Sequence, residues 1–268
     1  MNAFEFPLPE YLKRIALPEV PGPDEQGLNA VHSAQAFSIP FENLDIHLGR
    51  TISLEPSSLV KKLLNQPRGG YCFELNGLLR LALKSLGFTV RPAMARVLYG
   101  RTSPGARTHN VLLVTLSGRD WLADVGFGGP GLRLPLPIIT DQVYEQYGER
   151  YRLKHDAEYG IILQKESQNI FLDLYAFNDK DSTLDIDIEM SNHYTSTWPG
   201  SIFRLRRMCS LPQKWGRSTL TGMQLSIYRN GAAATRNVPP GPEYMKVLSE
   251  HFGIVLDADY EDLAPVIE

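Results

Sequence analysis

The stretch from Arg68 to Gly87, R-G-G-Y-C-F-E-L-N-G-L-L-R-L-A-L-K-S-L-G, constrains the fold more than any other. After Cys72 the apolar residues recur at helical spacing, which predicts a helix with most of its circumference buried. Gly69 and Gly70 allow a sharp turn into this helix, and Gly87 stands where a helix-ending glycine is expected. A helix buried on most sides needs other elements around it, so we expect the rest of the chain to be organised about this segment.

The predicted helix places Cys72 in its first turn. Unpaired backbone N–H groups and the helix dipole favour an anion there, so the sequence predicts a thiol with a lowered pKa, partly ionised near neutral pH. The alternative is a small apolar residue in a core, which is where most free cysteines lie. This segment alone leaves both interpretations open.

Length and composition limit the class of protein. A chain of 268 residues suits one large domain or two to three small ones, with ample core. Its net charge of −3 does not indicate nucleic acid or an anionic membrane surface as a partner. With only Cys72 and Cys209, the chain has no disulfide framework, and a reducing compartment is expected. No signal peptide or membrane-spanning run is apparent, so we expect a cytoplasmic protein; the sequence leaves homo-oligomer formation open.

The first part of the chain is expected to be helical. Asp24 is a predicted N-cap, and Pro40 should hold the segment 38–46 extended. The apolar pattern and the Pro and Gly positions predict helices at 9–15, 24–37, from Ser57 or Ser58 to 64, and 72–86.

Strand patterns follow and predict an antiparallel sheet curled into a small barrel. Its strands are expected at 88–98, 110–116, 121–125, 149–154, 159–165 and 170–176, with a short helix at 185–194. A hairpin of 220–228 and 232–237 is predicted around Asn230-Gly231, and a helix should run from Pro242 to just before Gly253.

The predicted fold class is therefore α+β with three successive units. These are a helical domain at 1–87 carrying Cys72, a β-barrel domain at 88–194 carrying His109 and Asp124, and an α/β lid-like domain at 195–268.

A reactive thiolate needs a base and a group that orients the base. His109 stands directly before an apolar strand, at the rim of the predicted sheet, where functional residues often lie. His32 is expected to be structural, whereas His47, His155 and His251 should be solvated and His193 lies in a polar stretch. Asp124 interrupts the apolar run W-L-A-D-V-G-F-G-G, and a carboxylate buried there needs a partner. His109 is the natural one.

The turn between the two strands decides whether these side chains meet. A two-residue turn at 118–119 would separate His109 from Asp124 by about 13 Å at ~3.4 Å per residue. A four-residue loop at 115–118 would place them opposite one another. We favour the loop, because it gives the buried carboxylate a donor.

These residues then have definite predicted roles. Cys72 is the nucleophile, and its backbone N–H is an oxyanion donor. His109 is the base and is held as an ion pair with the thiolate. Asp124 orients the imidazole. Papain-like proteases and transglutaminases use the same order, Cys, His, Asp. The chemistry is acyl transfer through a thioester, with the acceptor undetermined.

Four motifs, with a fifth weaker one, resemble the arylamine N-acetyltransferase family. They are I-P-F-E-N-L-D (39–45), R-G-G-Y-C-F-E-L-N (68–76), T-H-N-V-L-L-V (108–114), L-A-D-V-G-F-G-G (122–129), and, more loosely, Y-T-S-T-W-P-G-S-I-F (194–203). The resemblance independently implies a triad of Cys72, His109 and Asp124, a three-part architecture, and acetyl-coenzyme A as donor, with no metal.

The resemblance also implies a ping-pong reaction. Cys72 would take the acetyl group and pass it to a small arylamine, arylhydrazine or N-hydroxyarylamine. Phe41, Phe127 and Phe203 would line the acceptor pocket, although Phe41 and Phe203 also suit a core.

The glycines after Asp124 have two interpretations. Gly126, Gly128 and Gly129 would let coenzyme A approach the backbone closely, or they make only a tight turn; the resemblance favours the cofactor role. A basic run could attract the cofactor phosphates, but a solvated strand face is the favoured reading. It comprises Arg204, Arg206, Arg207, Lys214 and Arg217. Glu42 and Arg68 are expected to form a structural ion pair, and Cys209 has no predicted role.

Three alternatives remain at this stage. An amide synthase that moves a larger acyl chain would share the triad and differ in pocket volume. A cysteine hydrolase would share the acyl-enzyme and differ in the acceptor. A non-catalytic binding module would be expected if a triad position were lost, and none is.

Overall fold

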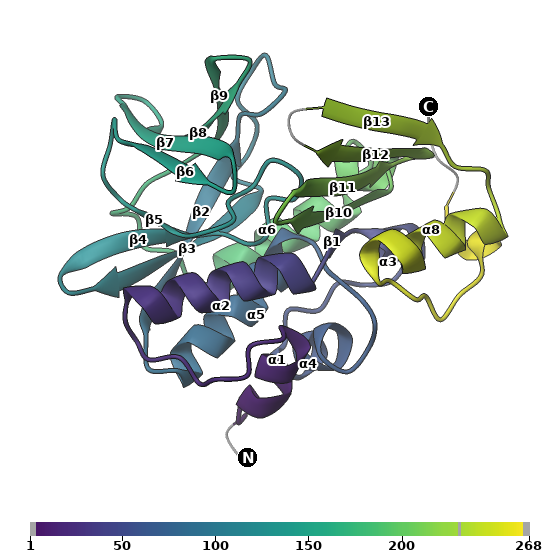
Figure 1. Ribbon diagram of the computed structural model, residues 1–268, viewed down its shortest axis with the longest axis horizontal. Helices are drawn as coiled ribbons and strands as arrows, with labels where there is room; N and C mark the ends of the chain where they lie inside the picture. The colour runs from purple at the N-terminus through teal and green to yellow at the C-terminus, as the bar shows by residue number, and fades with distance from the viewer. Residues whose placement is uncertain (1–3, 230–231, 265–268) are drawn as a thin grey trace.

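The computed structural model describes residues 4–229 and 232–264. In the first part of the chain, α1, α2 and α4 pack against α5 in the lower half of Figure 1, and the short α3 lies apart from them on the right. Their bounds are α1 (Leu8–Arg14), α2 (Glu25–Ser38), α3 (Leu44–His47), α4 (Pro56–Leu63) and α5 (Cys72–Ser85). The structure confirms the predicted α+β fold class, with helices first, then a barrel, then a further sheet with a helix.

Local chemistry explains where these helices begin and end. The Asp24 carboxylate accepts the Gly27 N–H at 2.8 Å and caps α2, as predicted. At the start of α5, the Glu74 carboxylate accepts the Tyr71 N–H at 3.0 Å. Gly87 follows α5 with φ of +86°, a conformation that glycine adopts at low cost.

The larger sheet is an antiparallel, nearly closed barrel. Its order is β5-β4-β3-β2-β9-β8-β7-β6. The strands are β2 (Thr89–Val97), β3 (His109–Leu116), β4 (Arg119–Ala123), β5 (Leu136–Pro137), β6 (Val143–Gln146), β7 (Glu149–Asp156), β8 (Gly160–Ser167) and β9 (Ile170–Phe177). All six predicted barrel strands are present, while β5 and β6 were not predicted.

Strand β3 separates two parts of the core. Val111 and Leu113 belong to the cluster inside the barrel, whereas Leu112 and Val114 pack with the helices around α5. Because side chains alternate along a strand, His109 shares the side of Val111, and Asn110 shares the side of Leu112.

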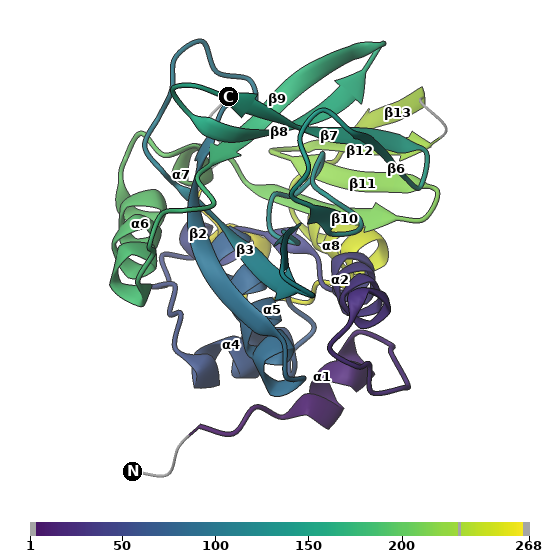
Figure 2. The same cartoon turned by 90° about the vertical axis from the view of Figure 1, so that its left-hand side faces the viewer.

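The smaller sheet combines an early segment of the chain with a late one. Its order is β1-β10-β11-β12-β13, formed by β1 (Phe41–Glu42), β10 (Met208–Gln213), β11 (Gly216–Thr221), β12 (Gln224–Arg229) and β13 (Ala232–Asn237). Helix α8 (Pro242–Phe252) packs beside it (Figure 1), beginning at Pro242 and ending before Gly253 as predicted. Figure 2 shows the two sheets from the side, with α6 (Asp185–Thr197) standing outside β2.

Two predictions in these regions are wrong. The segment 38–46 is extended only at β1 and then forms α3, because Pro40 restricts only the residues beside it. The predicted strand 220–228 is two strands, since Gly222 with φ of +57° turns β11 into β12. The predicted Asn230-Gly231 turn lies outside the described residues.

The division of the chain into domains at residues 87 and 194 stays a prediction. A short helix α7 (Ile202–Leu205) and a 3₁₀ turn, η1 (Tyr260–Asp262), complete the elements named here. Within residues 4–229 and 232–264, no helix has the length and apolar character needed to cross a bilayer.

Candidate active site

Cys72 is the first residue of α5, and its surroundings come from two other segments. The side chain is only 3% exposed. Its sulfur lies 4.0 Å from the carbonyl oxygen of Thr108, the residue before His109. On another side, a Cβ at Gly126 would stand 2.7 Å from the Cys72 Cα. The start of α5 therefore packs between the segment that leads into β3 and the loop that follows β4.

His109 and Asp124 are in direct contact. The His109 Nε2 lies 2.9 Å from the Asp124 Oδ2, and both side chains are buried. The expected hydrogen bond between them is thus present. It leaves Nδ1 as the ring nitrogen that can exchange a proton with another group.

The register that brings them together is neither of the two considered from the sequence. Leu116 pairs with Arg119, so the turn is Ser117-Gly118, and the last pair is Leu112 with Ala123. Continued by one residue, this register places Asp124 opposite Val111, which is two residues from His109 and on the same face. The favoured four-residue loop was wrong: it placed Asp124 opposite His109 and not opposite Val111. This difference of two residues along β3 leaves His109 and Asp124 on the same face of the sheet.

Asp124 is held by several donors besides His109. The Asn76 Nδ2 and the Gly126 N–H each donate to its Oδ1 at 2.8 Å. Burial alone would raise the pKa of Asp124, but the charge of His109 and these hydrogen bonds hold it below its usual range. The carboxylate therefore stays ionised beside the imidazole.

Asn76 ties this carboxylate to the helix of Cys72. It stands one turn along α5, and its Oδ1 accepts the Val125 N–H at 3.0 Å while its Nδ2 also reaches the Asn110 carbonyl at 2.8 Å. Asn76 ends the motif R-G-G-Y-C-F-E-L-N, but no role was predicted for it from the sequence. Its place as a polar residue on a helix predicted to be buried on most sides was a further signal.

His32 supports the site from α2. Its Nε2 accepts the Asp124 N–H at 3.1 Å, and its Nδ1 lies 3.3 Å from the Arg133 carbonyl, which makes Nδ1 the protonated nitrogen. Burial lowers the pKa of His32 to about 4, against the opposing effect of these partners. The expected structural role fits this geometry.

The thiol of Cys72 is not ionised by its helix start alone. Burial, followed by the negative charge of Asp124, raises the pKa of Cys72 above the ordinary range, although the hydrogen bond from the Phe73 N–H opposes them. The prediction of a lowered pKa is wrong, because it counted the helix terminus but not the loss of solvent. A proton acceptor is needed for the sulfur to react.

Aromatic rings surround these groups on the barrel side and on the side of the smaller sheet. The Phe127 ring lies 5.2 Å from the His109 ring, and the Tyr175 ring, which was not predicted, lies 5.0 Å from both. Phe41 and Phe203 pack together at 6.1 Å, with Phe203 also against Tyr71 at 5.7 Å. Phe127 therefore lies beside His109, and Phe203 contacts both Phe41 and Tyr71. Phe41 and Phe127 line one small cavity next to Asp124.

The glycines after Asp124 differ from one another. Gly126 must lack a side chain, because a Cβ would also lie 2.9 Å from the Cys72 carbonyl oxygen. Gly128 has φ of +79° and faces the Phe41 ring. Gly129 has ordinary spacing, with the Arg217 Nε 3.9 Å from its Cβ position. Close packing on Cys72 accounts for Gly126 and the backbone conformation for Gly128, while the predicted cofactor role stays a prediction.

The predicted basic run is not one surface. Arg207 is buried and donates to the Ala264 carbonyl at 2.6 Å, so the expectation of a solvated strand face is wrong for it. Arg217 pairs with Glu149 at 3.1 Å, which links β11 to the barrel. Arg204, Arg206 and Lys214 are exposed.

A cavity of about 540 Å³ opens between the barrel and the smaller sheet. Basic and aromatic side chains share its lining, among them Lys165, Lys214, Arg217, Trp215 and Tyr228. Burial lowers the pKa of Lys165 to about 8, although Glu149 opposes this at 2.5 Å. The residues described contain no cluster of three or more His, Cys, Asp or Glu side chains suited to a metal ion.

The expected ion pair between Glu42 and Arg68 is present at 2.8 Å and is part of a larger network. Arg68 also reaches Asp45 at 2.8 Å, and Lys62 contacts Asp45 at 2.7 Å and Glu74 at 2.8 Å. Since Glu74 caps α5, the network connects β1 to the start of the helix of Cys72.

Two further predictions concern single residues. His47 was expected to be solvated but is buried in α3, and burial lowers its pKa. His155 is exposed as expected, and both cysteines are free thiols.

Comparison with known proteins gives consistent sequence matches. A family model described as N-acetyltransferase matches residues 25–260. The chain is 37% identical over 247 residues to the arylamine N-acetyltransferase / N-hydroxyarylamine O-acetyltransferase of Salmonella typhimurium, covering 91% of this chain and 87% of that protein. It is 36% identical to an arylamine N-acetyltransferase of Mycolicibacterium smegmatis, covering 95% and 92%.

Solved structures give the same result. The arylamine N-acetyltransferase from Salmonella typhimurium superimposes with a TM-score of 0.88 at 36% identity, covering 94% of this chain and 92% of that one. The Mycobacterium marinum arylamine N-acetyltransferase, solved in complex with CoA, gives 0.86 at 33% identity, covering 92% of each chain.

Proposed function

Because the chain belongs to the arylamine N-acetyltransferase family and has that enzymatic function, we propose that it acts through a thioester on Cys72, with His109 and Asp124 as its partners. The acetyl group comes from acetyl-coenzyme A and goes to an arylamine, an arylhydrazine or an N-hydroxyarylamine. The observation that carries the proposal is the fixed, ionised Asp124 bonded to His109 at 2.9 Å, in the loop that packs on Cys72. A buried thiol of raised pKa needs such a proton acceptor.

In the first half-reaction, the Cys72 proton passes to His109 Nδ1 as the sulfur attacks the thioester carbonyl of acetyl-coenzyme A. The negative oxygen that forms is stabilised by the Cys72 N–H at the helix start. The carbon–sulfur bond to coenzyme A then breaks, and the leaving thiolate takes the proton from His109. Asp124 stabilises the imidazolium between these transfers.

In the second half-reaction, the amine nitrogen attacks the acetyl-Cys72 carbonyl. An arylamine is a weak base, so it is neutral and nucleophilic near pH 7. His109 removes the proton that the nitrogen loses, and this proton returns to the Cys72 sulfur as the carbon–sulfur bond breaks. We propose that Phe127 beside His109, together with Phe41 and Phe203, lines the acceptor pocket.

We propose that coenzyme A enters along the Gly126–Gly129 loop. A relative from Mycobacterium marinum was solved in complex with CoA, and here the cavity of about 540 Å³ carries basic side chains suited to phosphates. Gly129 brings this loop next to the cavity, because its Cβ position lies 3.9 Å from the Nε of Arg217, which lines the cavity. Residues 195–268 would then cover the cofactor as a lid-like domain.

Intact-mass measurement tests the thioester. Incubation with acetyl-coenzyme A and no acceptor should add one acetyl group to the native protein and to Cys209→Ala, and none to Cys72→Ala. A gain that survives Cys72→Ala would overturn the assignment of the nucleophile. Acylation by longer acyl-coenzyme A donors but not by acetyl-coenzyme A would instead favour an amide synthase.

A further inference from the structure

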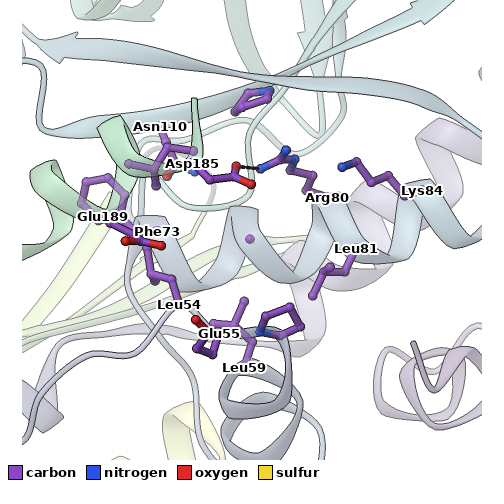
Figure 3. Close-up of a pocket in the computed structure, with 14 residues that line it drawn as sticks. Leu54, Glu55, Leu59, Phe73, Arg80, Leu81, Lys84, Asn110, Asp185 and Glu189 are labelled. Atoms are coloured by element: carbon purple, nitrogen blue, oxygen red, sulfur yellow. Dashed lines mark hydrogen bonds and ion pairs between the residues drawn. The ribbon is translucent and has the colours of Figure 1, made fainter. Parts of the chain in front are cut away.

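A second cavity lies on the opposite side of β3 from His109. It has a volume of about 250 Å³, opens to the surface, and is lined by α4, α5, α6 and the strands β2 and β3. Figure 3 shows Asn110, Asp185 and Arg80 along one side of it and Leu54, Glu55 and Leu59 along the other. Its volume is just below the range of pockets for drug-sized ligands, so it suits a smaller molecule.

Two buried polar atoms at this cavity have no hydrogen-bond partner within residues 4–229 and 232–264. They are the Asn110 Oδ1, an acceptor, and the Arg80 Nε, a donor. Asn110 is only 2% exposed and points to the side of β3 that faces α5. Buried polar atoms are nearly always satisfied, so this pair indicates a missing partner that can donate and accept.

The Arg80 Nη1 pairs with Asp185 from α6 (Figure 3), while the buried Nε has no partner among the described residues. The other charged side chains at the cavity are Glu55, Glu189 and Lys84, so its charges nearly balance and select no strongly charged ligand.

The remaining walls are apolar and suit a flat ring. Phe73, Leu59, Leu81, Pro92 and Ile188 supply them. On α5, Gly77 allows Leu59 of α4 to pack closely, since a Cβ there would lie 3.0 Å from a methyl carbon of Leu59.

We propose that this cavity binds a small aromatic carboxamide. The amide N–H would donate to the Asn110 Oδ1, the amide oxygen would accept from the Arg80 Nε–H, and the ring would lie on the apolar wall. A carboxamide carries a donor and an acceptor on one neutral planar group, which is the combination that the two unpartnered atoms require.

The products of the proposed reaction, N-aryl acetamides, belong to this chemical class; that link rests on the proposed function. Phe73 and Asn110 directly follow Cys72 and His109 in the chain, so the cavity adjoins the active site through the backbone while opening on another face. The structure therefore points to a product-type site distinct from the acceptor pocket.

Binding is tested on Cys72→Ala, which cannot acetylate anything through that sulfur. Benzamide is titrated while the Arg80 Nε–H and the Asn110 side-chain amide are followed by NMR, with methyl benzoate as a matched probe lacking the N–H. We expect saturable shifts of both groups with benzamide and at least tenfold weaker binding of methyl benzoate.

Two tryptophan variants locate the site. Ile188 is 7% exposed and lines the cavity, whereas Ile186, on the outer side of the same helix, is 63% exposed. Ile188→Trp should fill the cavity and weaken benzamide binding at least tenfold, and Ile186→Trp should leave it unchanged. Asn110→Leu should also lose binding while its melting temperature does not fall, because the acceptor it removes has no partner.

Equal binding of the two probes, or unchanged benzamide binding in a folded Ile188→Trp protein, would overturn the proposal. If benzamide binds as expected but no acetyl group is found on Cys72, the cavity assignment stands and the link to the reaction product falls. The two results are therefore separable.

Discussion

At the scale of single residues, the site depends on how the environment of each group changes its proton affinity. Burial and the charge of Asp124 raise the pKa of Cys72 and outweigh the opposing hydrogen bond from the Phe73 N–H at its helix start. Asp124 stays ionised only because donors surround it. The contact between His109 and Asp124 was predictable from the sequence. The pKa shifts of Cys72 and Asp124 were not, since they depend on solvent access and, for Asp124, on the hydrogen bonds that Asn76 and Gly126 donate.

Thiol alkylation tests the dependence of Cys72 on His109. In a Cys209→Ala background, His109→Ala should react at least ~10-fold more slowly at pH 7, with the inflection of its pH profile above ~8.5, the value of an ordinary thiol. The reason is that burial raises the pKa of the Cys72 thiol and no imidazole remains to accept the proton. His193→Ala, at an exposed position, is the control. An unchanged profile in His109→Ala would remove the base from the mechanism.

His32 should make the fold sensitive to mild acid. Its pKa of about 4 in the folded protein is below the ~6.5 of an unfolded histidine, so the unfolded chain binds the proton first. The stabilisation is complete above pH ~6.5 and is lost as the pH falls towards 4, by about 3 kcal/mol in total. Urea unfolding between pH 7 and 4.5 measures it.

The matched variants for this measurement are His32→Gln and His155→Gln. Replacing the buried histidine should remove most of the pH dependence in this range, whereas replacing the exposed one should not. The same slope in all three proteins would contradict the assignment.

At the scale of elements, regular patterns were predicted well and tight turns were not. Helix α5 was expected from apolar spacing and its glycines, and it lies within one residue of the predicted bounds. The β3–β4 turn was misplaced because Ser117 has φ of +49°. Residues other than glycine rarely adopt this conformation, so a serine gave no signal of the turn. The contact between His109 and Asp124 was still predicted, since an error of two residues keeps both on one face.

The loop after β4 should tolerate no side chain at Gly126. Gly126→Ala places a Cβ 2.7 Å from the Cys72 Cα, backbone that cannot move without shifting α5. We expect a loss of about 1–3 kcal/mol in unfolding free energy and at least tenfold lower acetylation of Cys72. Differential scanning calorimetry and intact mass measure these. Gly129→Ala, whose nearest neighbour would be 3.7 Å away, should keep native stability; equal losses in both variants would show that the contact with α5 is not the cause.

At the scale of the whole molecule, distant segments are joined by pairings that no local pattern reveals. Phe41 pairs with Ser210 in β10, although 38–46 lies in the helical first part of the chain. The order of helices, barrel and mixed sheet was predictable because each part has its own periodicity. The insertion of β1 into the last sheet was not, since two residues carry no strand signal.

The buried ionic network should be a major support of this arrangement. Glu42 is fully buried and bonds Arg68 at 2.8 Å, so Glu42→Ala would leave the guanidinium with less compensation for its burial. We expect a loss of about 3–5 kcal/mol in unfolding free energy, measured by urea unfolding. The exposed pair of Glu243 and Arg236 at 3.8 Å is the control, and Glu243→Ala should cost less than ~1 kcal/mol. Similar losses would mean that the network contributes little.

The pairing of β1 with β10 also sets when the protein can become active during its synthesis. Phe41 leaves the ribosome long before Ser210, its strand partner. At about 5–20 residues per second, the interval is roughly ten to thirty seconds. During that time the first strand has an open edge, and the loop beside the nucleophile lacks its neighbour Arg217. A nascent chain released before β10 should therefore contain the three proposed triad residues and still lack the sheet that we propose covers the cofactor.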